Sequence, residues 1–101
     1  MLQIRPNCEL CDKDLAPDAT DAMICTYECT FCSNCVAHLS NVCPNCGGGF
    51  SPRPIRPVNA WRAGVSLGHQ PASQDRIHSK YRLEDLADYI DGVKTVPPEK
   101  R

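Results

Sequence analysis

At 101 residues the chain has the length of one domain with at most a short extension. Its net charge of −1 is the sum of two halves of opposite sign. Residues 1–50 carry a net charge of −4, and residues 51–101 carry a net charge of +3. The acidic first half is expected to repel phosphate backbones, which argues against nucleic-acid binding there. No stretch approaches the roughly 20 apolar residues of a membrane-spanning helix, and no signal-peptide run is visible, so a cytoplasmic location is expected.

The first segment, residues 1–50, holds all eight cysteines, in the pattern C-x2-C-x13-C-x3-C-x2-C-x2-C-x7-C-x2-C. A segment of about 50 residues rarely builds a core large enough to fold alone, so either disulfides or metal must stabilise it. In a reducing cytoplasm thiols persist and bind metal. Disulfides are the alternative, and they would require that the protein is exported. The Cys-x-x-Cys spacing aims two sulfurs at one ion, and eight thiolates complete two tetrahedral zinc sites without an open position. Two structural Zn²⁺ ions are therefore predicted, with the ligands Cys8, Cys11, Cys25, Cys29, Cys32, Cys35, Cys43 and Cys46.

Short elements are predicted between the cysteines. Residues 22–25 and 30–31 are expected to form a β-hairpin, and Ser33-Asn34 offer caps for a helix from about Cys35 to Ser40. The run Gly47-Gly48-Gly49 is expected to end this module. A small core between the two metal sites is expected from four apolar side chains, Ile24, Phe31, Val36 and Leu39.

This cysteine pattern resembles that of the RING finger family, a cross-braced treble-clef fold. Phe31 directly precedes Cys32, and the last pair reads Cys43-Pro44-Asn45-Cys46, as in that family, whereas Cys29 stands where most members have histidine. The resemblance covers about residues 5–50, and the whole chain also looks like a family of small, uncharacterised bacterial cysteine-rich proteins. It implies interleaved pairing, with Cys8, Cys11, Cys32 and Cys35 at site 1 and Cys25, Cys29, Cys43 and Cys46 at site 2. Sequential pairing of the first four and the last four cysteines is the alternative.

The same resemblance implies a partner-binding surface. In RING fingers an apolar residue near the first knuckle and a proline in the last one contact the ubiquitin-conjugating enzyme, and Leu10 and Pro44 match these positions, with Val42 beside them. The tryptophan usual between the sixth and seventh ligands is absent, and Gly47 replaces the basic residue that often follows the last ligand. A ubiquitin-ligase-like role is therefore an alternative hypothesis and not the leading one.

Residues 51–78 are predicted to form an extended arm or linker. The run Ser51–Pro57 contains three prolines, which fix their own φ and bias the preceding residues towards extended conformations. Trp61 beside Arg62 is a candidate anchor for a partner, because both residue types are common binding hot spots. Docking of Trp61 onto the chain's own finger is the alternative. Nucleic-acid binding through residues 51–62 is the alternative, since this stretch has three arginines and no acidic residue, and Trp61 could stack on a base.

Residues 79–92 are predicted to form an amphipathic helix, followed by a flexible tail at 93–101. Gly92 sits where a helix C-cap is expected. The apolar stripe needs a partner, which is either the finger or a second copy of the chain, so a homodimer through this helix is one expectation. The stripe follows i, i+3, i+4, i+7 spacing and consists of Leu83, Leu86, Ala87 and Ile90.

Together these features predict a small metal-stabilised α+β protein without catalytic activity of its own. No serine or cysteine nucleophile with a paired base is visible, because every cysteine is assigned to a metal ion. The leading hypothesis is a protein–protein interaction module with an unidentified protein partner. A zinc–thiolate redox switch is a further alternative, because oxidation of the thiolates expels the metal.

Overall fold

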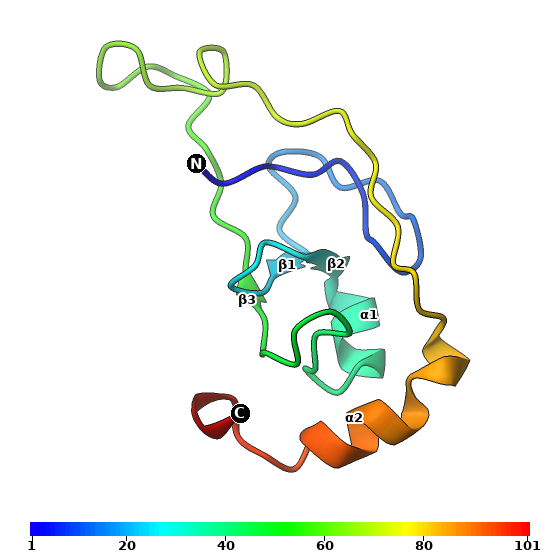
Figure 1. Ribbon diagram of the computed structural model, residues 1–101. Coiled ribbons are helices and arrows are strands. Elements are labelled where there is room, and N and C mark those ends of the chain that lie inside the picture. Colours follow the sequence, from blue (N-terminus) through cyan, green and yellow to red (C-terminus); the bar gives the residue numbers. More distant parts are fainter.

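A computed structural model describes all residues from 1 to 101 and shows a small cysteine-rich finger with a long chain wrapped around it (Figure 1). The finger contains a three-stranded antiparallel sheet of order β2-β1-β3. Its elements are β1 (Ala22–Ile24), β2 (Thr30–Cys32), helix α1 (Ser33–His38) and β3 (Ser51–Pro52). The C-terminal part adds a 3-10 turn at Leu83–Asp85, helix α2 (Ala87–Val93) and a second 3-10 turn at Pro98–Lys100. Neither α-helix has the length and apolarity needed to cross a bilayer.

The predicted hairpin and the helix after it are present. Met23 pairs with Phe31 in the hairpin and with Pro52 on the other side of β1. Helix α1 begins at Ser33, two residues earlier than expected, because β2 leads directly into it through the extended backbone of Cys32. It ends before Ser40 and Asn41, whose φ angles of 52° and 59° are left-handed and cannot continue a helix.

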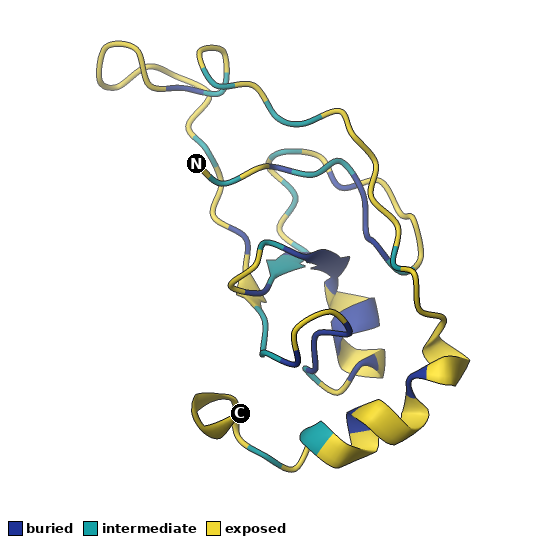
Figure 2. Cartoon of the chain, viewed as in Figure 1, coloured by how far each residue is buried: buried dark blue, intermediate teal, exposed yellow.

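The core of the finger lies among β2, α1 and the cysteines. Phe31 and Leu39 have no exposed surface, and the ring of Phe31 meets that of Phe50 edge-on with 5.3 Å between centroids. Figure 2 shows the buried residues concentrated in this part of the chain. Val36 is buried as expected, whereas Ile24, which pairs with Thr30 at the turn end of the short hairpin, is only half-buried.

The segment 51–78 has little regular structure, but it is bound to the N-terminal residues of the chain. Its later part runs beside residues 4–9: the main-chain N–H of Ser73 donates to the carbonyl of Ile4 at 3.0 Å, and that of Ser79 donates to the carbonyl of Glu9 at 2.7 Å. The amide of Asn7 holds the middle of this strap by donating to the carbonyl of Ile77 at 2.8 Å. The segment is thus a strap that closes over the N-terminal residues.

The two arginines at the start of this strap act within the fold. Arg53 is only 4% exposed and donates to the carbonyls of Arg5 at 2.8 Å and Ala16 at 2.9 Å. Arg56 donates to the carbonyls of Leu2 and Gln70 in the same way. Two of the three cationic groups that suggested nucleic-acid binding are therefore occupied by main-chain carbonyls.

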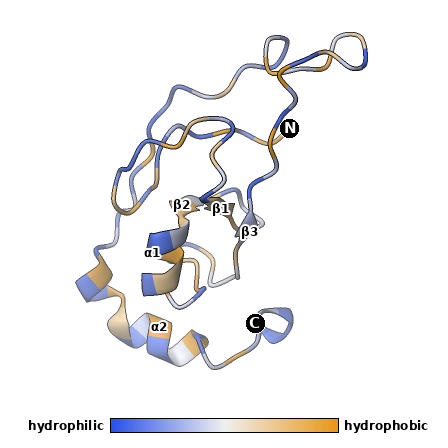
Figure 3. Cartoon of the chain, turned by 180° about the vertical axis from the view of Figure 1, so that it is seen from behind, coloured by the Kyte–Doolittle hydropathy of each residue, from blue (hydrophilic) through white to orange (hydrophobic).

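The C-terminal helix differs from the predicted span of 79–92. Residues before Leu83 are not helical, because Arg82 has extended backbone and the main chain of Ser79 is bound to Glu9. Gly92 does not end α2; it lies inside the helix, and Lys94 is the C-cap. Hydrophobic and hydrophilic residues alternate along α2 (Figure 3). The partner of its apolar stripe is the chain's own finger, since Leu86 and Ile90 belong to the buried core cluster there.

Candidate metal centres

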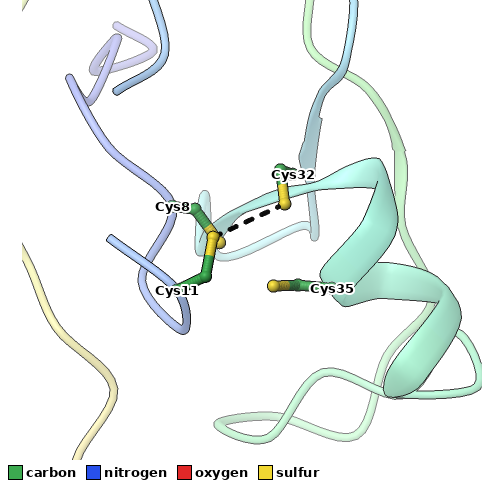
Figure 4. A group of neighbouring side chains, drawn as sticks. All are labelled: Cys8, Cys11, Cys32 and Cys35. Carbon is green, nitrogen blue, oxygen red and sulfur yellow. Dashed lines mark hydrogen bonds between the residues drawn. The ribbon is translucent and has the colours of Figure 1, made fainter. Parts of the chain in front are cut away.

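The first cysteine cluster joins two parts of the chain. The Sγ atoms of Cys8, Cys11, Cys32 and Cys35 all lie within 4.8 Å of one another, and they face each other across a small gap (Figure 4). Zinc–sulfur bonds of about 2.3 Å at tetrahedral angles place sulfurs about 3.8 Å apart. The distance between the sulfurs of Cys11 and Cys32 is 3.8 Å. The donor set and its spacing therefore fit a four-thiolate metal site.

Local backbone geometry brings these four sulfurs together. The turn after Cys8 is closed by the N–H of Asp12, which donates to the Cys8 carbonyl at 2.9 Å, and Asp12 itself has a left-handed φ of 64°. On the other side, Cys32 is the last residue of β2 and Cys35 stands in the first turn of α1. The strand-to-helix junction thus presents two thiols to the turn that holds the other two.

The second cluster is less compact. The Sγ atoms of Cys25, Cys43 and Cys46 lie within 4.8 Å of one another, and that of Cys29 does not lie within this distance of all three. The sulfur of Cys29 accepts a hydrogen bond from the side-chain amide of Asn45 at 3.4 Å, and that of Cys46 accepts one from a main-chain N–H at 3.4 Å. N–H groups directed at sulfur stabilise thiolates, so these donors suit a metal-bound state.

Burial controls the protonation of these thiols. Desolvation raises the pKa of the Cys35 and Cys43 thiols far above the ordinary value, and the neighbouring thiols add to the effect. Desolvation also raises the pKa of the Cys29 thiol, against the lowering effect of the hydrogen bond from Asn45. Without metal these groups are therefore neutral at pH 7, and a bound cation would have to displace their protons.

The grouping of the cysteines is interleaved along the chain. Cys8 and Cys11 lie with Cys32 and Cys35, and Cys25 lies with Cys43 and Cys46. The sequential alternative therefore does not describe this structure. His38 takes no part in either cluster, since its Nδ1 is bound to the carbonyl of Asn34 at 2.8 Å. The first group is the one that the resemblance implied, and the second contains three of its four implied members; the place of Cys29 in site 2 and the identity of the metal stay predictions.

Residues 1–56, which contain all eight cysteines, match the family described as a protein of unknown function, DUF1272. The chain belongs to this family. It is also 53% identical over 78 residues to an uncharacterized protein of Rhizobium meliloti (strain 1021), an alignment that covers 76% of this chain and 86% of that protein. The expected membership in a family of small bacterial cysteine-rich proteins is thereby confirmed. No solved structure matches the chain.

The surface expected around the knuckles is mostly closed in this DUF1272 chain. Val42 has no exposed surface, Pro44 is buried, and Leu10 is half-buried against the core. Leu86 and Ile90 of the C-terminal segment share a buried cluster with Val42, and the Tyr89 hydroxyl donates to the carbonyl of Cys43, so this segment closes the loop from one side. Trp61, in contrast, is 80% exposed. Among the four residues suggested for partner binding, only Trp61 is freely accessible.

Sequence reasoning missed an ion pair with a buried carboxylate beside the first cluster. The carboxylate of Glu9 accepts hydrogen bonds from the main-chain N–H of Thr30 at 2.5 Å and from the guanidinium of Arg5 at 2.8 Å. Because Glu9 lies between Cys8 and Cys11, these bonds fix the first knuckle against β2. On the outer side of this knuckle, an exposed ion pair between Arg76 and Asp12 also holds the turn in place. Hydrogen bonding from Arg76 lowers the pKa of Asp12.

Proposed function

We propose that this chain is a structural zinc-binding protein with a RING-like, treble-clef arrangement of two four-cysteine sites, working in a reducing compartment such as the cytoplasm. The observation that carries the proposal is the set of four sulfurs at the first cluster, whose spacing suits tetrahedral coordination. Four soft thiolates select zinc or iron among the common metals. A site closed by four thiolates has no position for an activated water, so the metal supports the fold and does not catalyse a reaction.

Native mass spectrometry of the full chain tests this proposal directly, because the mass increment identifies both the metal and its number. Two zinc ions per chain are expected, with four thiol protons lost at each site. The Cys8→Ser and Cys43→Ser variants should each retain at most one tightly bound ion. A chain that is compact without metal, or whose cysteines are joined to each other, would contradict the proposal.

The protein is proposed to act as a protein-interaction module. The exposed loop at residues 57–67, within the strap, is the best candidate for the surface that contacts a partner. This loop is closed by the N–H of Leu67, which donates to the carbonyl of Pro57 at 2.7 Å, and it projects from one end of the molecule (Figure 1). Its large apolar side chains are exposed, namely Val58, Trp61 and Val65. Single exposed apolar residues are ordinary, but several on one projecting loop are typical of an interaction site.

The charge around this loop indicates what kind of partner it suits. No acidic residue occurs from 51 to 74, whereas the finger is acidic, and Arg62 is exposed beside Trp61. A tryptophan flanked by arginine is a frequent anchor in protein interfaces. We therefore expect a protein partner with an acidic rim around an apolar pocket. Nucleic acid is a poorer candidate because Arg53 and Arg56 are already bound to carbonyl groups.

Cross-linking capture from the host cell tests this role when three forms of the protein are compared. A specific partner should be captured by the wild type and lost with Trp61→Ala. Tyr27→Ala is the matched control, because Tyr27 is an aromatic residue 73% exposed on the finger and outside the loop. Both variants should hold the same amount of zinc as the wild type. Equal capture by all three forms would contradict a role for the loop.

A redox switch is the second candidate, since each cluster has one exposed cysteine, Cys11 in the first and Cys46 in the second. An oxidant such as hydrogen peroxide can reach a zinc-bound thiolate at these positions, and oxidation releases the metal. Zinc released by mild peroxide and taken up again after reduction would support this role. Retention of both ions would count against it.

A further inference from the structure

The C-terminal segment binds the main chain of the loop that carries the last two cysteines. The hydroxyl of Tyr89 donates to the carbonyl of Cys43 at 3.2 Å. The guanidinium of Arg101 donates to the carbonyls of Asn41 at 2.7 Å and Gly47 at 3.2 Å. Gly47 has a φ of +80°, and a Cβ there would stand 3.1 Å from the Tyr89 hydroxyl, so a larger residue would be strained and tightly packed where the segment crosses.

Apolar contacts accompany these hydrogen bonds. Leu86 and Ile90 stand four residues apart, on one face of the helical segment, and are 3% and 6% exposed. Both belong to the buried cluster that contains Leu39 and Val42 of the finger, and Val93 packs against the same cluster. The opposite face, with Asp88 and Asp91, is exposed. The finger thus offers α2 an apolar surface bordered by main-chain carbonyls.

Helix α2 has little stability of its own. It has seven residues, contains Gly92, and has no side-chain N-cap. Helices of this length are not stable alone in water, and glycine in a helix interior weakens them further. The residues that connect it to the strap, Lys80–Arg82, are exposed and irregular. The helix is therefore ordered mainly by the surface on which it lies.

We infer that the surface formed by residues 39–49 is a binding site for an amphipathic helix, with α2 as its occupant within the chain. The partner that fits is a helix of another protein with the pattern of Leu86, Tyr89 and Ile90: apolar residues at i and i+4 and a hydrogen-bond donor at i+3. A basic group beyond the helix completes the match, because Arg101 binds the loop carbonyls and the finger carries a net charge of −4. Such a helix displaces α2. This inference rests on the proposed role as an interaction module.

A synthetic peptide tests the site in the full-length, zinc-loaded protein. The probe is a fluorescein-labelled copy of residues 79–101, and its binding is followed by fluorescence anisotropy. The wild type should bind it weakly, because the tethered helix competes at a high effective concentration. The double variant Leu86→Asp/Ile90→Asp empties the surface and should bind the peptide at least about tenfold more tightly, since the apparent affinity scales with the fraction of open protein.

Matched peptides establish which side chains matter. A peptide with the same two aspartates should not bind the double variant, and a peptide with Asp88→Asn, altered on the exposed face, should bind like the unaltered copy. In case the double variant loses zinc, Tyr89→Phe and Arg101→Gln remove only hydrogen bonds at the surface and should each tighten peptide binding about threefold. Native mass spectrometry should show two zinc ions in every protein used.

The inference is overturned if zinc-loaded variants bind the peptide no better than the wild type, or if the two-aspartate peptide binds equally well. This outcome is independent of the loop at 57–67. Failure of Trp61-dependent capture would contradict the proposed interaction role of that loop and leave the peptide result standing.

Discussion

Replacement of Glu9 by alanine should destabilise the finger without removing a single metal ligand. The side chain of Glu9 is 2% exposed and accepts two hydrogen bonds, one of them from the guanidinium of Arg5. Hydrogen bonds to charged groups contribute about 1.5–3 kcal/mol each, and loss of one partner of a buried ion pair costs about 3–5 kcal/mol. We expect Glu9→Ala to lower the free energy of unfolding by about 3 kcal/mol. Glu9→Gln keeps an acceptor for Thr30 and should cost about half as much.

Urea unfolding at a fixed free zinc concentration measures this effect, because zinc binding itself contributes to the unfolding free energy. With a slope of about 1 kcal/mol/M, the midpoint should fall by about 3 M. Glu84→Ala is the control, since the carboxylate of Glu84 lies 3.5 Å from Arg82 in an exposed ion pair, for which less than about 1 kcal/mol is expected. Equal midpoint shifts for the two variants at equal zinc content would refute the reasoning.

Three further outcomes are expected. Exhaustive chelation should unfold residues 5–50, because the metal supplies much of the folding energy, and amide NMR should lose the dispersed signals of this segment. Lowering the pH should release the metal: burial raises the pKa of the Cys35 and Cys43 thiols, so protons compete strongly, and zinc affinity should fall about tenfold per pH unit for each proton taken up. A dye that reports free zinc between pH 8 and pH 5 would follow this release. Finally, Arg53→Gln should destabilise the protein by about 2–3 kcal/mol in urea unfolding, because a buried guanidinium that donates to two main-chain carbonyls is lost, whereas Arg62→Gln, at an exposed position, should have almost no effect.

The sequence predicts the cysteine clusters because their geometry is mostly local. A Cys-x-x-Cys turn fixes two sulfurs within a few residues, and Thr30 and Phe31 have the short extended pattern that delivers Cys32 to the start of a helix. Family resemblance supplied the long-range step, namely which pairs meet. The same reasoning located α2 approximately but placed its start too early, because the main chain of Ser79 is bound to Glu9 instead of beginning a helix. At the other end the helix continues through Gly92 to Val93.

Contacts between distant segments were outside the reach of sequence patterns. The sequence around Arg53 does not reveal whether its guanidinium binds phosphate, solvent or main-chain carbonyls. Only the folded chain places the carbonyls of Arg5 and Ala16 beside it. The resemblance placed Leu10 and Pro44 on a partner surface, with Val42 beside them. Nothing in the first 50 residues shows that Leu86 and Ile90 pack into the same buried cluster as Val42.

The alternation of the two ligand sets has a consequence for synthesis on the ribosome. The last ligand of the first cluster is Cys35, so that cluster is complete before the second one can be. Cys25 and Cys29 have by then been translated, but their companions Cys43 and Cys46 have not. During this interval the nascent chain carries two thiols whose cluster partners have not yet been made. With zinc as the proposed metal, we expect the yield of folded chain to depend on the zinc supply at this stage.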